Sequence, residues 1–108
     1  MTEQESPKVR IVEVGPRDGL QSLNAHYSVE TRLEWIGKLA HAGIQEIECG
    51  AFVRADLVPA MANSEEIFQS LAGSPFRKWA LVPNHRGLQS ALDSGADALV
   101  FFTSATEG

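Results

Sequence analysis

The sequence predicts an α/β fold in which short parallel strands alternate with helices. Three observations support this prediction. Short runs of β-branched and apolar residues end at glycine or proline, and the segments between them repeat apolar residues at helical spacing. No long linker or low-complexity segment interrupts this order. The segments HAGIQEIE and DSGADALV also repeat one unit weakly, because both pass from a helix end through glycine into a strand. Such alternation indicates parallel strands joined by right-handed crossovers.

The first strand and the first helix are expected in residues 9–43. Residues 9–14 are short and rich in branched side chains, and Gly15-Pro16 ends them, so they are predicted to form a buried strand. Ser28 is a candidate N-cap, since apolar residues recur at helical spacing from Val29 to Ala40. Gly43 is suited to the position just after the helix end.

The second strand and the second helix are expected in residues 44–71. Residues 44–49 form the predicted strand, and a loop that contains Gly50 and Pro59 follows it. Asn63 and Glu66 have the spacing of a capping box, which predicts a helix from there to Leu71.

The remaining elements follow the same order. Residues 79–82 are predicted to form the third strand, which stops at Pro83. Asn84 is a candidate cap for a short helix that Gly95 ends, and residues 98–102 form the fourth strand. Two architectures remain open from this pattern. One is a doubly wound open sheet, and the other is part of a (β/α)₈ barrel, which normally takes about 250 residues.

Composition limits the classes of function. The 108 residues are enough for one domain, and 44% hydrophobic with 21% charged residues is ordinary for a globular protein. The net charge of −5 gives no basic field for a nucleic acid or an anionic membrane, so neither is an expected partner. Cys49 is the single cysteine, which excludes an intrachain disulfide and favours a reducing compartment. The polar start is typical of neither a signal nor a transit peptide, so residues 1–7 are interpreted as a flexible tail and the protein as cytoplasmic.

Polar residues follow the predicted strand ends, where parallel α/β folds place their functional sites. Charged groups at the first two strand ends are expected to converge on one face. In chain order, the candidates are Arg17, Asp18 and Gln21 after the first strand, Glu48 at the second, Asn84 and His85 after the third, and Thr103 and Ser104 after the fourth.

These residue types suit metal-assisted chemistry. Asp18 offers a hard oxygen ligand for Mg²⁺ or Mn²⁺, and Arg17 offers a charged fork for a substrate carbonyl, a carboxylate or a developing enolate. Glu48 is a partner that would orient Arg17. The alternative interpretation is a local ion pair in a solvated loop. Glu46 shares a face with Glu48, so a buried carboxylate is expected there too, and the sequence does not name its partner.

Other reactive or aromatic residues are given structural interpretations. Cys49 is expected to be a small buried group. Trp35 and Trp79 are expected to contribute packing. The three histidines, at positions 26, 41 and 85, lack the spacing of a metal-binding pair and are expected at the surface or in loops.

Several segments together resemble the 3-hydroxy-3-methylglutaryl-CoA lyases, which are metal-dependent TIM-barrel enzymes. The segments are VRIVEVGPRDGLQS, AGIQEIECGAFV, VPAM, VPNHRGLQSALDSGAD and VFFTSATEG. GPRDGLQ is the most specific of them. The resemblance implies that residues 8–108 are the N-terminal half of a (β/α)₈ TIM barrel, with about four βα units.

The resemblance also implies a function. It is the retro-Claisen cleavage of 3-hydroxy-3-methylglutaryl-CoA, an acyl-CoA, to acetyl-CoA and acetoacetate. Carried over by position, Asp18 would bind a divalent metal, Mg²⁺ or Mn²⁺. Arg17 would contact the substrate and stabilise the enolate, Glu48 would support it, and Gln21 would lie at the substrate.

The sequence departs from the family pattern in two ways. VRADLVPAM replaces VSPKWVPQM, and Ala51 stands where serine is common in relatives. The family's other metal ligands and its catalytic cysteine are expected beyond residue 108, so the 108 residues alone are predicted to be inactive. A half-barrel leaves strand edges open, which predicts a homo-oligomer.

Two rival functions remain. One is a Claisen-type acyltransferase of the same superfamily, such as an isopropylmalate or citramalate synthase. Leu20 argues against it, because these synthases tend to have glutamate there. The other is a non-catalytic half-barrel module that assembles with itself or with a partner.

Overall fold

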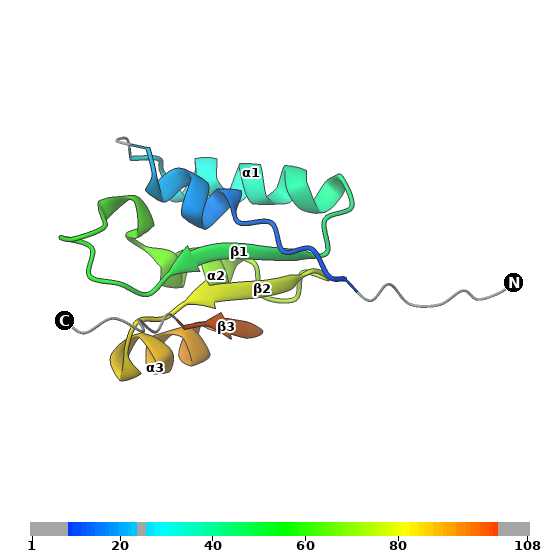
Figure 1. Ribbon diagram of the computed structural model, residues 1–108. Helices are drawn as coiled ribbons and strands as arrows, with labels where there is room; N and C mark the ends of the chain where they lie inside the picture. Colours follow the sequence, from blue (N-terminus) through cyan, green and yellow to red (C-terminus); the bar gives the residue numbers. More distant parts are fainter. Residues whose placement is uncertain (1–8, 24–25, 102–108) are drawn as a thin grey trace, which may run out of the picture.

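The computed structural model describes residues 9–23 and 26–101 and shows the predicted alternation of strands and helices (Figure 1). The elements are α1 (Val29–His41), β1 (Glu46–Ala51), α2 (Ser64–Ser70), β2 (Arg77–Leu81), α3 (His85–Ser94) and β3 (Ala98–Val100). A π-helical turn covers Gly15–Gly19 and a 3₁₀ turn covers Pro59–Met61. Among these described residues, no helix combines the length and the apolar character that a membrane crossing requires.

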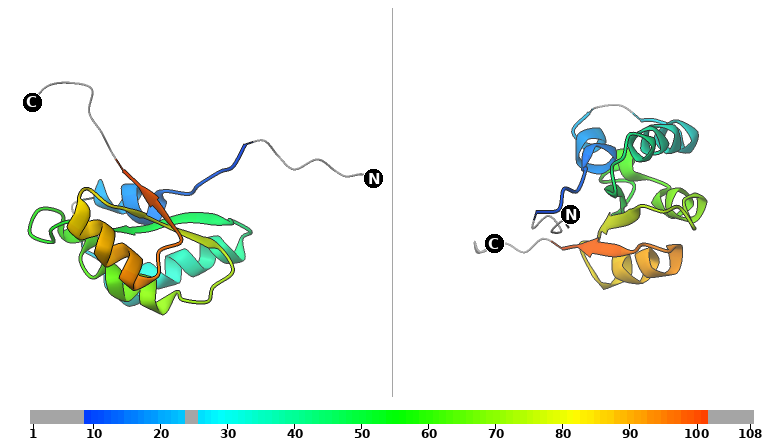
Figure 2. Two further views of the ribbon diagram at one scale, coloured as in Figure 1. Left: turned by 90° about the horizontal axis from the view of Figure 1, so that it is seen from below. Right: turned by 90° about the vertical axis from the view of Figure 1, so that its right-hand side faces the viewer.

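Strand order decides between the two architectures. β1, β2 and β3 are parallel and lie in chain order. The segment before the Gly15–Gly19 turn adds one parallel bridge, Glu13 to Ile47, on β1. A doubly wound sheet reverses its strand order at a switch point, whereas a barrel adds each strand beside the previous one. The three α-helices also cover one face of the sheet, as the end-on view in Figure 2 shows. Both features are those of a barrel segment.

The first predicted strand is the main correction to the secondary structure. In residues 9–14 only Glu13 pairs with β1: its N–H donates to Glu46 O at 2.9 Å, and its carbonyl accepts from Glu48 N at 2.8 Å. Val9 and Ile11 are 74% and 75% exposed, so the predicted burial of this segment was wrong. The reason is tertiary, because within the described residues no further strand covers the outer side of this segment.

Capping residues and glycines in the sequence predicted the ends of α1 and α3 correctly. The Ser28 side chain accepts from the backbone at the start of α1, and the Asn84 side chain accepts from Gly87 N at 2.8 Å at the start of α3. Gly43 and Gly95 follow the ends of α1 and α3 with φ of 102° and 97°, a conformation that suits glycine. These predictions are confirmed.

The predicted capping box of α2 is not formed. Asn63 precedes the helix with φ of 62°, and its side chain makes no capping hydrogen bond. An Asn in this left-handed conformation does not have the extended backbone that a capping side chain requires. The helix itself is present, so its start depends on contacts from elsewhere in the fold.

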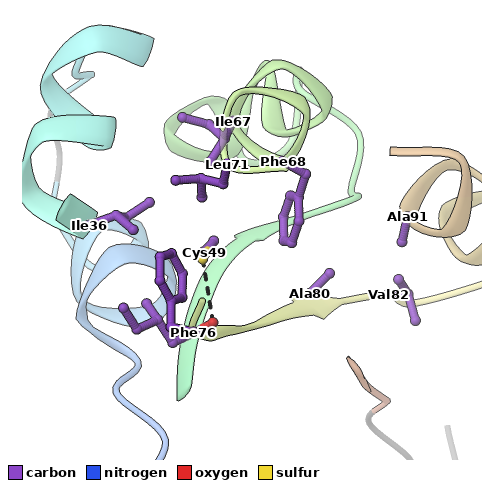
Figure 3. Packing of buried hydrophobic residues seen from close by; sticks show 10 residues of the cluster. Ile36, Cys49, Ile67, Phe68, Leu71, Phe76, Ala80, Val82 and Ala91 are labelled. Carbon is purple, nitrogen blue, oxygen red and sulfur yellow. Dashed lines mark hydrogen bonds between the residues drawn. The ribbon is translucent and has the colours of Figure 1, made fainter. Parts of the chain in front are cut away.

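The main core lies between the sheet and the three α-helices (Figure 3). Its buried members are Ile36, Ile47, Cys49, Ile67, Phe68, Leu71, Phe76, Ala80, Val82 and Ala91. A second buried cluster lies nearer the carboxyl ends of the strands and contains Leu20, Ala51, Met61 and Leu81. Through Leu20 and Met61, this second cluster supports the Gly15–Gly19 turn and the loop between β1 and α2.

Candidate active site

The Gly15–Gly19 turn presents two charged side chains in opposite environments. The Val14 carbonyl accepts from the backbone N–H groups of residues 17, 18 and 19 at 3.1, 2.7 and 3.2 Å. Three donors on one acceptor fix a tight π-type turn, a geometry often found at functional sites. Arg17 is buried as a result, whereas the Asp18 side chain is 61% exposed.

Arg17 forms a buried ion pair with Glu48. The Arg17 Nε and Nη2 atoms each lie 2.8 Å from Glu48 Oε1, and both side chains are only 9% exposed. Two N–H groups on one carboxylate oxygen fix the plane of the guanidinium. The predicted partnership of these two residues is therefore present. It joins the end of the first segment to β1.

The remaining Arg17 nitrogen points toward the other two predicted site residues. Nη1 lies 3.4 Å from Asp18 Oδ1 and 3.4 Å from Gln21 Oε1. These contacts are long for charge-assisted hydrogen bonds, which are normally about 2.8 Å. Nη1 therefore has the capacity to exchange these contacts for a substrate oxygen. The four residues to which the family resemblance assigned active-site roles therefore lie together.

Asp18 fits a metal site as one ligand of a larger set. Its carboxylate is accessible and is a hard oxygen donor of the kind that Mg²⁺ and Mn²⁺ prefer. Within residues 9–23 and 26–101, no group of three or more His, Cys, Asp or Glu side chains is placed to hold a metal ion. A complete site would require ligands from outside the described part of the chain.

Glu46 has the partners that the sequence left unnamed. Glu46 Oε2 accepts from Arg10 Nε at 2.6 Å, and Oε1 accepts from Trp79 Nε1 at 2.8 Å. Arg77 Nε lies 4.0 Å from the same Oε1. Trp79 therefore contributes a specific hydrogen bond, and its interpretation as packing alone was incomplete. Glu46 lies two residues before Glu48 on β1, so this strand anchors Arg10 of the first segment and Arg17 of the turn that follows it.

This network predicts a pH-dependent stability. The hydrogen bonds from Arg10 and Trp79 hold the pKa of Glu46 below its ordinary value of 4.5. The stabilisation is therefore present above pH 4.5 and is lost as the pH falls through the lower folded-state pKa. In urea unfolding, Glu46→Gln is expected to lower the free energy of unfolding at pH 7. Below about pH 5, the free energy of unfolding of this variant is expected to decrease less steeply with falling pH than that of the parent.

Glu34→Gln is the matched control, because Glu34 lies on the exposed face of α1 and, within residues 9–23 and 26–101, forms an ion pair only with Lys38, at 3.6 Å. It is expected to leave both the stability at pH 7 and its pH dependence near those of the parent. An unchanged acid slope in Glu46→Gln would contradict the network.

Cys49 is a structural residue in the core. Its thiol is fully buried and donates to Ile47 O at 3.4 Å (Figure 3). Burial raises the pKa of the thiol to about 12, so almost no thiolate exists at neutral pH. The predicted role as a small buried group is confirmed.

Cys49 is consequently expected to resist alkylation in the folded protein. At pH 8, iodoacetamide should modify it about a thousandfold more slowly than in denaturing urea, because both thiolate fraction and access are reduced. Mass spectrometry of the peptide that contains Cys49 measures this ratio. Similar rates in the two conditions would contradict the burial.

Among the described residues, the end of β2 adds no side chain to the Arg17–Glu48 cluster. Asn84 uses its side chain to cap α3, and His85 is exposed at the start of that helix. Thr103 and Ser104 lie outside the described residues. His26 and His41 are exposed, in accord with the predicted surface positions.

Two residues near the site carried no clear signal in the sequence. Ser64 is buried, and its Oγ accepts from Ala51 N at 3.2 Å and donates to Met61 O at 2.8 Å. A Cβ on Gly50 would lie 2.6 Å from this oxygen, so glycine is required there for the close approach. Arg32 is also buried, on α1. Contacts between segments distant in the sequence bury both side chains, and the spacing of residues in the sequence does not reveal such contacts.

Known proteins resemble this chain over most of its length. A lyase of Pseudomonas aeruginosa, named 3-hydroxy-3-isohexenylglutaryl-CoA/hydroxy-methylglutaryl-CoA lyase, is 42% identical over 101 residues, which are 93% of this chain and 34% of that protein. The hydroxymethylglutaryl-CoA lyase of Pseudomonas mevalonii is 42% identical over 100 residues, or 92% of this chain and 33% of that protein. The chain thus spans about a third of the length of these relatives.

Solved structures agree with the strand order. The crystal structure of hydroxymethylglutaryl-CoA lyase from Pseudomonas aeruginosa superposes with a TM-score of 0.85 at 40% identity, over 93% of this chain and 34% of that one. The HMG-CoA lyase from Brucella melitensis also gives 0.85, at 33% identity, over 94% of this chain and 36% of that one. These neighbours are TIM barrels, so the fold is the N-terminal part of a (β/α)₈ barrel. The HMGL-like family profile matches residues 8–108, and the chain belongs to the HMGL-like family.

Proposed function

We propose that this chain provides the N-terminal part of a hydroxymethylglutaryl-CoA lyase, with Arg17, Asp18, Gln21 and Glu48 in its active site. The observation that carries the proposal is the buried Arg17–Glu48 pair, which leaves Nη1 facing the accessible Asp18 at the carboxyl edge of the sheet. Barrel enzymes place their catalytic groups at this edge. The similarity to lyases of this name supports the same reaction.

The proposed reaction is a retro-Claisen cleavage. A base removes the proton of the tertiary hydroxyl, the C–C bond breaks, and its electron pair becomes the enolate of acetyl-CoA, which then takes up a proton. Arg17 binds the substrate oxygen on which negative charge develops, and Glu48 keeps the guanidinium in the required plane. Gln21 lies within reach of the same nitrogen and helps to hold the substrate. Asp18 would hold a divalent cation, Mg²⁺ or Mn²⁺, which would supply further positive charge to the substrate oxygens.

The substrate class is proposed to be a 3-hydroxy-3-alkylglutaryl-CoA. A structural relative from Acinetobacter was solved in complex with coenzyme A and 3-methylmalate, at 30% identity and a TM-score of 0.83. The relative from Pseudomonas aeruginosa is named for both a methyl and an isohexenyl substrate. Both names support an acyl-CoA ligand, and the length of the 3-alkyl group is the property to test.

The test uses the protein expressed from its whole reading frame. Purified protein is incubated with Mg²⁺ or Mn²⁺ and either 3-hydroxy-3-methylglutaryl-CoA or its isohexenyl analogue, and the release of acetyl-CoA is measured. The proposal expects metal-dependent cleavage of at least one of them. A parallel assay with acetyl-CoA and 2-oxo acids tests the acyltransferase alternative. Condensation without cleavage would overturn the lyase assignment.

Two further parts of the proposal concern the 108 residues by themselves. They are expected to lack lyase activity, because a single carboxylate holds Mg²⁺ weakly. They are also expected to self-associate through the open strand edges. Light scattering that shows a monomer would contradict the second expectation, and acetoacetate release by the isolated segment would contradict the first. A cytoplasmic location is proposed on the basis of the free thiol of Cys49, which suits a reducing compartment.

A further inference from the structure

The loop after β1 closes on itself at its base. Residues 52–63 leave the end of β1 and return at the start of α2. Ser64 Oγ joins the two ends, since it accepts from Ala51 N at 3.2 Å and donates to Met61 O at 2.8 Å. Residues 61–64 are called the loop foot below. The rest of the loop stands at the carboxyl edge of the sheet, the edge that carries Arg17 and Asp18.

The loop foot has a conformation that needs an outside anchor. Asn63 has φ of 62° and makes no side-chain capping bond. Asparagine adopts this left-handed conformation more readily than other residues except glycine, but the conformation still differs from the extended one of a helix-capping residue. The helix that follows, α2, has only seven residues, and so short a helix has little stability of its own. Contacts from other elements must therefore hold the foot.

Arg32 of α1 makes such a contact. Its Nη1 donates to the carbonyl of Ala62 at 2.6 Å, across 30 residues of sequence. Its side chain lies in the interior, where the residue is 2% exposed, and burial lowers the pKa of the guanidinium below its ordinary 12.5. Among the described residues, Nε and Nη2 have no hydrogen-bond partner in the protein.

The energetics indicate what the arginine contributes. A buried charge without an acid partner is costly, and an aliphatic side chain in the same space would avoid this desolvation. The guanidinium offers one thing that an aliphatic chain lacks, which is the hydrogen bond to Ala62 O. Its contribution is therefore to the position of the loop foot more than to overall stability.

The loop foot is connected to the candidate site by packing. Met61 is 1% exposed and belongs to the buried cluster that contains Leu20 and Leu81. Leu20 directly follows the turn that presents Arg17 and Asp18. The loop and its foot also form one wall of a cavity of about 510 Å³, whose other side includes the start of α3. A displaced foot would change both the support of the turn and the shape of this cavity.

We propose that Arg32 is a positioning residue, which holds the loop foot through Ala62 and so fixes one wall of the 510 Å³ cavity, and that this cavity receives the acyl-CoA. The part that concerns acyl-CoA rests on the function proposed above. The hydrogen bond and its effect on the loop do not.

Trypsin provides a readout that is independent of lyase activity. Arg54 is exposed within the loop and is a cleavage site there, whereas Lys78 is buried in β2 and becomes accessible only on global unfolding. In the protein expressed from its whole reading frame, Arg32→Met is expected to speed cleavage after Arg54 about tenfold relative to cleavage after Lys78. Arg32→Lys keeps a charged donor and is expected to restore part of the protection.

Lys38→Met is the control on the same helix, since Lys38 is exposed and its ion pair in the described part of the chain is the one with Glu34. It is expected to leave cleavage after Arg54 unchanged. If Arg32→Met is cleaved no faster than this control, the proposal is overturned. A parallel rise in cleavage after Lys78 would also overturn it, because it would indicate a general loss of stability.

Kinetics test the connection to the cleft. In the active enzyme, Arg32→Met is expected to raise KM for the acyl-CoA about fivefold, with a smaller effect on kcat. Faster cleavage after Arg54 with an unchanged KM would refute the positioning role. A third outcome is faster trypsin cleavage after Arg54 in the variant when the parent protein cleaves neither acyl-CoA substrate. It would refute the proposed function and leave the anchoring of the loop foot supported.

Discussion

Replacing Arg17 by methionine is expected to lower kcat/KM for the acyl-CoA by about a thousandfold or more, through loss of the cation that faces the developing enolate. The same change leaves Glu48 as a buried carboxylate without its partner, which is expected to cost about 3 kcal/mol of unfolding free energy. Steady-state release of acetyl-CoA and urea unfolding measure the two effects separately. The catalytic effect is expected even where the variant remains folded.

A double variant separates catalysis from stability. Arg17→Met with Glu48→Met replaces the ion pair by two apolar side chains of similar length, a change that often leaves stability unaltered or improved. It is expected to regain most of the lost unfolding free energy and to remain inactive. Lys38→Met removes an exposed positive charge from α1 and should change neither quantity. Recovery of activity together with stability would show that Arg17 has only a structural role.

Replacing Asp18 by asparagine is expected to weaken the binding of Mn²⁺ by about a hundredfold. Asparagine has nearly the same shape, so the Gly15–Gly19 turn should persist, but its amide carries no negative charge. Equilibrium dialysis gives the affinity, and the Mn²⁺ concentration needed for half-maximal activity gives an independent value. The loss of affinity should exceed any change in unfolding free energy, because Asp18 is largely exposed and Arg17 contacts it only at 3.4 Å.

Asp93→Asn is the matched control for this change. Asp93 is also an exposed aspartate, but it lies on α3 and accepts from Gln89 Nε2 at 2.9 Å. It is expected to leave the affinity for Mn²⁺ unchanged. An Asp18→Asn variant that bound and used Mn²⁺ as well as this control would refute the role of Asp18 as a ligand.

The sequence predicted most of the secondary structure because its signals are local. Ser28 and Asn84 cap their helices, and Gly43 and Gly95 end them, through groups only a few residues apart. The Arg17–Glu48 pair was also predictable, because the rule that site residues follow parallel strands brings neighbouring strand ends together. The motif GPRDGLQ added a specific reaction to this geometry.

Other features depend on which segments meet in space. The partners of Glu46 come from positions 10, 77 and 79, and no spacing rule connects them in advance. The capping box at Asn63 has the correct residue types, but tertiary contacts at the loop foot impose a backbone that the box cannot use. The first segment has the composition of a strand, yet only Glu13 pairs, because strand formation requires a neighbour to pair with.

The sequence by itself determined the alternation of strands and helices, the ends of α1 and α3 and the identity of the charged groups at the strand ends. These depend on backbone conformations and hydrogen bonds within a few residues. Only the tertiary structure decided the consecutive strand order, the partners of Glu46 and the contact from Arg32 to Ala62. These features join residues 19 or more positions apart. Their energies depend on burial and on the meeting of specific donors and acceptors, which exist only after the chain has folded.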